Sequence, residues 1–155
     1  MTRIKGDMDT PYSDFTTEHL TSKEFLDRNQ PLYVQRHNFD PACGDKVKLE
    51  ESIGRLQERD LIGKHPDLFF CWCKKDTGTV GRTSVLMKAV AMNLRLDGPL
   101  VSEQLLDYCV YSQLLMVDRG FSGAAPDKDG YIKKLKEYPG SKTFDKQLKQ
   151  MGLHV

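Results

Sequence analysis

The feature that most constrains the fold is a run of six apolar residues, Leu68 to Cys73, followed by a polar loop with two glycines, Asp76 to Thr83. A continuous apolar run of this length predicts a strand that is central in its sheet and covered on both faces. The residues after the loop, Ser84 to Leu96, are apolar nearly all round and predict a buried helix. The N–H groups of such a loop and the positive end of the following helix converge on one point, which is an arrangement that binds anions. We therefore expect an anion-binding loop, in which the carboxylate of Asp76 is the one group that opposes an anion.

The order of residues in this loop resembles the phosphate-binding loop of the protein tyrosine and dual-specificity phosphatases, which has a cysteine, five residues, an arginine and then a serine or threonine. Asp76 stands at the position of the nucleophilic cysteine, Arg82 at that of the arginine and Thr83 at that of the hydroxyl residue. The resemblance also implies a general acid on an upstream loop, for which Asp40 is the first candidate and Asp45 the second. The phosphate cradle that it implies consists of Thr77, Gly78, Thr79, Val80, Gly81 and Arg82.

An aspartate in place of the cysteine changes the chemistry of the loop. A thiolate can attack phosphorus and leave again, whereas an enzyme that uses a carboxylate normally needs a divalent cation. Two like charges about 4 Å apart repel by roughly 4 kcal/mol at an effective dielectric constant near 20. We therefore expect Asp76 to form an ion pair with Arg82. The segment from Gly120 to Asp127 also lacks the glutamine that orients water in the tyrosine-specific branch of the family.

These departures predict a catalytically impaired phosphatase-like domain, a pseudophosphatase, that binds or regulates another protein. The expected partner is a protein, phosphorylated or not, and neither a metal nor a cofactor is expected. One alternative is an active cysteine-dependent phosphatase lineage in which Asp76 has replaced the cysteine. Another is a magnesium-dependent phosphatase of the haloacid dehalogenase type with Asp76 as nucleophile, which would recruit Lys133 or Lys134 and the pair Asp127 and Asp129.

Simpler interpretations of the same residues stay open. Gly78 and Gly81 are also compatible with a tight turn that binds nothing, and Asp40 with a turn before a proline. Cys73 lies too far from Arg82 to replace the missing nucleophile at the family's spacing. Cys71 and Cys73 are two residues apart, so they share one face of a strand and are expected to be buried thiols, with Trp72 on the other face.

The whole chain is predicted to be one α/β domain over residues 1–155, with a central sheet flanked by helices as in a compact tyrosine or dual-specificity phosphatase, and with residues 1–15 as an N-terminal arm. No strand is expected after the loop. The N-terminal part is lean in strands, which leaves the sheet either reduced or completed by another chain. The predicted elements are a helix from Thr21 to about Asn29, a strand at Leu32–His37, a helix capped by Asp45 that ends near Arg59, a helix from Ser102 and a helix from Asp127.

The composition limits which partners and which cellular compartment are expected for this chain. A formal net charge of +1 gives no overall reason to bind nucleic acid or a membrane surface, and no apolar run approaches the ~18 residues of a membrane span. The four cysteines form no Cys-x-x-Cys pair. These features favour the cytoplasm, and a protein delivered into a host cell would show them as well. The lysines of the last thirty residues or so indicate a solvated helix face or, alternatively, a docking surface for an acidic partner.

Overall fold

The computed structural model describes residues 22–37, 39–119, 121–122, 125–126 and 128–155. The predicted arm at residues 1–15, Thr21, Gly120 and Asp127 lie outside the described residues. The elements in chain order are α1 (Ser22–Arg36), α2 (Lys46–Glu58), β1 (Phe69–Cys73), β2 (Gly81–Ser84), β3 (Ala89–Asn93), the 3-10 helix η2 (Leu94–Asp97), α3 (Glu103–Arg119), β4 (Phe121–Ser122), β5 (Ala125–Pro126), α4 (Lys128–Glu137) and α5 (Ser141–Gln150).

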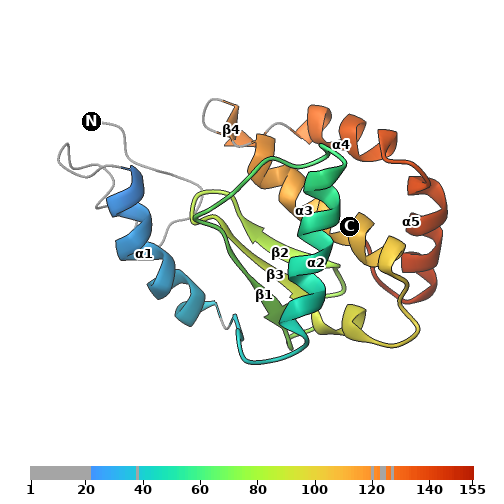
Figure 1. Cartoon of the computed structure of the whole chain (residues 1–155), viewed down its shortest axis with the longest axis horizontal. Coiled ribbons are helices and arrows are strands. Elements are labelled where there is room, and N and C mark those ends of the chain that lie inside the picture. Colours follow the sequence, from blue (N-terminus) through green and yellow to red (C-terminus); the bar gives the residue numbers. More distant parts are fainter. Residues whose placement is uncertain (1–21, 38, 120, 123–124, 127) are drawn as a thin grey trace.

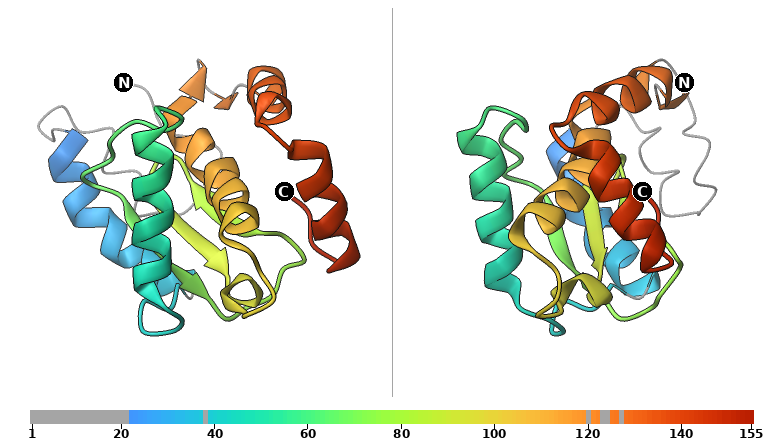
Figure 2. Two further views of the ribbon diagram at one scale, coloured as in Figure 1. Left: turned by 45° about the vertical axis from the view of Figure 1, so that its right-hand side comes forward. Right: turned by 90° about the vertical axis from the view of Figure 1, so that its right-hand side faces the viewer.

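A three-stranded sheet lies between two helical layers, α1 on one face and α2 with α3 on the other (Figures 1 and 2). Its strand order is β1-β3-β2, with β1 parallel and β2 antiparallel to β3. The predicted α/β class with a sheet flanked by helices is confirmed. The central strand is β3, all five residues of which are buried. The expectation that the run from Leu68 to Cys73 forms the central strand is therefore wrong, because β1 is an edge strand.

The apolar run of β1 is explained by burial on both faces. Phe69, Cys71 and Cys73 belong to the apolar cluster under α1, whereas Phe70 and Trp72 pack in the cluster under α2 and α3. This alternation confirms that the two thiols share a face opposite Trp72.

The prediction of a helix at residues 84–96 is wrong. The chain forms β2, a four-residue turn, β3 and η2 there, so strands do follow the loop, and the short pair β4 and β5 comes later still. A segment that is apolar on all sides suits a buried helix and a doubly covered strand equally well. Long-range contacts decide between them: the side chain of Gln30 donates to the carbonyl oxygens of Met87 (2.8 Å) and Lys88 (3.2 Å), and Lys88 takes a positive φ of 47°.

The N-terminal prediction is also wrong in part, because α1 continues through Pro31 to Arg36 and no strand forms at Leu32–His37. Pro31 has no N–H to offer the carbonyl of Asp27, but Asp27 is exposed, so water can bond this oxygen. The ring of Tyr33 stacks on that of His37, one helical turn later. The helix therefore continues past Pro31 with this one backbone hydrogen bond missing.

The later helices agree with their sequence signals. Asp45 caps α2 by accepting a hydrogen bond from the N–H of Val47 (3.0 Å), and Ser102 accepts one from the N–H of Leu105 at the start of α3. The two helices are joined by Asp107, which is 6% exposed and accepts hydrogen bonds from Ser52 and Arg55. No described helix is long and apolar enough to span a membrane.

Candidate functional site

The loop at residues 76–80 connects two strands, β1 and β2, and is stabilised from within. Asp76 Oδ1 accepts hydrogen bonds from the N–H of Gly78 (2.8 Å) and the side chain of Asn93 (3.0 Å), and its Oδ2 lies 3.3 Å from Arg95. These contacts lower the pKa of the Asp76 carboxyl group, with the Gly78 N–H as the largest cause. The expected ion pair between Asp76 and Arg82 is therefore wrong, because Arg95 takes that place.

Other backbone groups of the loop are also occupied. The N–H of Val80 donates to the carbonyl oxygen of His154 (3.0 Å), and the N–H of His154 donates to that of Gly78 (3.2 Å). The hydroxyl of Thr79 donates to the carbonyl oxygen of Gly81 (3.0 Å) and also contacts the hydroxyl of Thr77. The residues from Thr77 to Gly81 thus form a turn that is paired with the last residues of the chain, and the element that follows this turn is the strand β2 and not a helix.

Arg82 and Thr83 lie on opposite faces of the sheet, since they are consecutive residues of β2. Arg82 points toward α1, where it donates to the carbonyl oxygen of His37 (3.0 Å) and contacts the sulfur of Cys73 (3.0 Å). Thr83 points toward α3 and donates to Gln113 (2.8 Å). The structure therefore does not bring these two side chains to one cradle with Asp76.

The acid candidates have structural partners of their own. Asp40 accepts a hydrogen bond from the N–H of Ala42 (3.3 Å) and lies 3.4 Å from Lys74, while Asp45 caps α2. Burial is the main cause that raises the pKa of Cys71, to about 12, and that of Cys43. All four cysteines are free and buried. Within the described residues, no three His, Cys, Asp or Glu side chains converge where a metal ion could be held.

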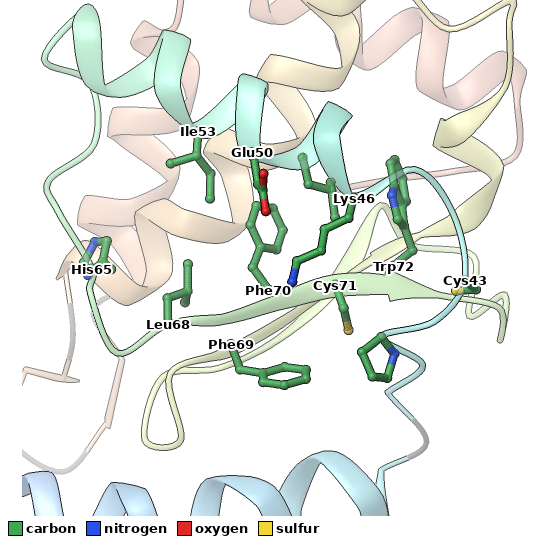
Figure 3. A pocket seen from close by; sticks show the side chains of 12 residues that line it. Cys43, Lys46, Glu50, Ile53, His65, Leu68, Phe69, Phe70, Cys71 and Trp72 are labelled. Carbon is green, nitrogen blue, oxygen red and sulfur yellow. The ribbon is translucent and has the colours of Figure 1, made fainter.

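A groove along the outer edge of β1 is a second candidate site. Its volume is about 340 Å³, and Figure 3 shows Lys46, Glu50 and Ile53 projecting from α2 toward β1. The groove is lined by Pro41, Cys43, Lys46, Leu49, Glu50, Ile53, His65, Leu68, Phe69, Phe70, Cys71 and Trp72. Sequence reasoning named none of these as a binding residue, and the only signal was the shortage of strands in the N-terminal part.

Comparison with known proteins gives no relative: no family model, curated protein or solved structure matches this chain.

Proposed function

We propose that this chain is a noncatalytic module that binds a segment of another protein in the groove beside β1. The observation that carries the proposal is the edge position of β1, which leaves one side of an apolar strand facing a groove instead of a neighbouring strand. Unpaired strand edges are common sites of protein association. The four buried free thiols suit a cytoplasmic, reducing compartment.

The noncatalytic part of the proposal is supported by the loop. A phosphate cradle needs free N–H groups and an arginine on the same side, whereas Gly78 and Val80 use their N–H groups internally and Arg82 faces α1. The resemblance to the tyrosine and dual-specificity phosphatases rests on residues 76–84, and the proposed binding does not depend on it.

Binding is tested by selecting peptides from a displayed random library on the immobilised protein. The Ile53→Arg variant places a charge in the groove, and Val47→Arg is its matched control, since Val47 lies on the same helix, is 56% exposed and is outside the groove. We expect selected peptides to bind the wild type and Val47→Arg alike and to bind a folded Ile53→Arg variant at least tenfold more weakly. Selection of no peptide, or of peptides that tolerate Ile53→Arg, would overturn the proposal.

Catalysis is tested by the Asp76→Cys variant, which restores the nucleophile that the phosphatase motif contains. We expect it to hydrolyse p-nitrophenyl phosphate no faster than Asp76→Ser. The N–H of Val80 still bonds His154, and Arg82 still points toward α1. Turnover that appears with cysteine and not with serine would contradict the noncatalytic assignment.

A further inference from the structure

We infer that the bound segment enters the groove in an extended conformation and pairs with β1 as an additional strand of the sheet. This inference rests on the proposed function and specifies the partner: an uncharged, largely apolar stretch of peptide, without a phosphate group. It is carried by the backbone of β1, the shape of the groove and the charges on its walls.

The backbone of β1 has a free hydrogen-bonding side. Phe69 donates its N–H toward β3, to the carbonyl oxygen of Lys88 (2.9 Å), and pairing in register with β3 continues to Cys73. Because successive residues of a strand direct their backbone groups to opposite edges, Phe70 directs its N–H and C=O away from β3. Among the described residues, none forms a hydrogen bond with these two groups. A peptide residue placed opposite Phe70 would supply both partners.

The groove is open at one end and closed at the other. Leu68, Phe69 and Phe70 are half-buried, so the edge is accessible there. Trp72 is 1% exposed, and its indole N–H donates to the carbonyl oxygen of Asp45 in the loop that also contributes Pro41 and Cys43 to the groove. An added strand can therefore continue past Leu68, but it must end or turn outward before Trp72.

The walls favour apolar side chains over charged ones. Leu49 and Ile53 of α2 face the edge together with Phe70, and the volume of about 340 Å³ is at the low end of the ~300–1,000 Å³ typical of ligand pockets, enough for a few side chains. Lys46 and Glu50 carry opposite charges that cancel, so the groove presents no net charge for a phosphate. His65 is already engaged with Asp118, 2.5 Å away.

The position of the β1 edge beside the α2 side chains favours a single peptide over a second copy of the chain as the partner. Side chains of α2 that line the groove project toward β1, as Figure 3 shows. Strands in a sheet lie about 4.8 Å apart, so a second copy paired at the same edge would bring its own α2 side chains toward the groove that these side chains line. A single extended segment adds no such helix.

The experiment uses a peptide that the library selection yields and that Ile53→Arg weakens. Each of its residues in turn is N-methylated, which removes one backbone donor and leaves the side chains unchanged. We expect a period of two: methylation of the residues that face β1 weakens binding roughly tenfold or more, and methylation of the alternate residues has little effect. Hydrogen exchange followed by NMR provides the second readout, in which the peptide slows exchange of the Phe70 amide at least tenfold more than that of Phe69.

The outcomes distinguish this inference from the proposed function. If the peptide binds in the groove but shows no period of two and no protection of Phe70, strand pairing is overturned and groove binding stands. If no peptide binds, both fail. Strand pairing with a partner is also overturned if the protein alone forms a concentration-dependent dimer that protects Phe70, or if binding requires a phosphorylated residue.

Discussion

The carboxylate of Asp76 stabilises the turn at residues 76–80 through its hydrogen bonds and its ion pair. Its hydrogen bonds with Gly78 and Asn93 and its ion pair with Arg95 exist only in the folded chain, and they lower its pKa. A lowered pKa means that folding favours the ionised form. This contribution to stability is complete above the ordinary pKa of aspartate, near 4, and is lost as the pH falls through the lower value of the folded state.

We predict that Asp76→Asn is less stable than the wild type at neutral pH and that the gap narrows in acid. The difference between the two thermal midpoints, measured by calorimetry, should decrease as the pH falls from about 4 through the lowered pKa of the folded state, where the native carboxylate becomes protonated. Glu58→Gln, at an exposed position in the last turn of α2, serves as the control and should show no such trend. A gap between wild type and Asp76→Asn that stays constant over this range would contradict the role assigned to Asp76.

Two glycines on either side of the start of α2 should respond in opposite ways to the same substitution. Gly44 has a φ of +71°, and an added Cβ would lie 2.3 Å from Trp72 Cδ1, so Gly44→Ala should destabilise the protein by about 1–3 kcal/mol. Gly54 lies inside α2 with no atom within 4 Å of an added Cβ, so Gly54→Ala should stabilise it by about 0.5–1 kcal/mol. Urea unfolding measures both changes, and effects of the same sign would refute this account.

At the scale of elements, Arg82 links the sheet to the end of α1, in addition to the hydrogen bonds of Gln30 and the apolar cluster under this helix. Arg82 donates to the carbonyl oxygen of His37 beside the end of α1, and its guanidinium lies over the ring of Phe39, 5.2 Å from the centroid. We predict that Arg82→Met costs about 1.5–3 kcal/mol and speeds amide exchange in α1 more than in α3. Arg82→Lys keeps the charge but not the planar fork, and should recover only part of the loss. Unchanged exchange in α1 would show that the helix is held by other contacts.

The elements that could be predicted from the sequence are those with local signals. Asp45 and Ser102 mark the starts of α2 and α3, and the run at Leu68–Cys73 marks β1. The segment at 84–96 could not be assigned, because its apolar pattern suits either structure and its turn is fixed by Gln30, far away in the sequence.

The candidate site was predictable to a similar extent. The loop at 76–80 was found, but its occupation by His154 has no local signature. The groove depends on which strand is at the edge, and strand order is a property of the whole sheet that no single segment encodes.

At the scale of the whole molecule, the last residues of the chain pack and hydrogen-bond against the loop at residues 76–80. Leu153 is 2% exposed in the same apolar cluster as Val80 and Trp72, and His154 bonds through its backbone to the loop. The Arg95 side chain also donates to the carbonyl oxygen of Met151. The loop, η2 and the chain end therefore stabilise one another, and within this arrangement the N–H groups of Gly78 and Val80 are occupied.

We predict that the side chain of Leu153 and the backbone of His154 hold the loop against the chain end, and that the imidazole of His154 contributes little. Leu153→Ala should lower the free energy of unfolding by about 2–5 kcal/mol, because it leaves a cavity in the main cluster. His154→Ala keeps the two backbone hydrogen bonds and removes only an exposed ring, so it should change stability by less than about 0.5 kcal/mol. Deletion of residues 153–155 should destabilise more than Leu153→Ala and should release the N–H of Val80 to rapid exchange. If the deletion instead left the Val80 amide protected, the loop would be stable by itself, and the absence of a phosphate cradle would need another cause.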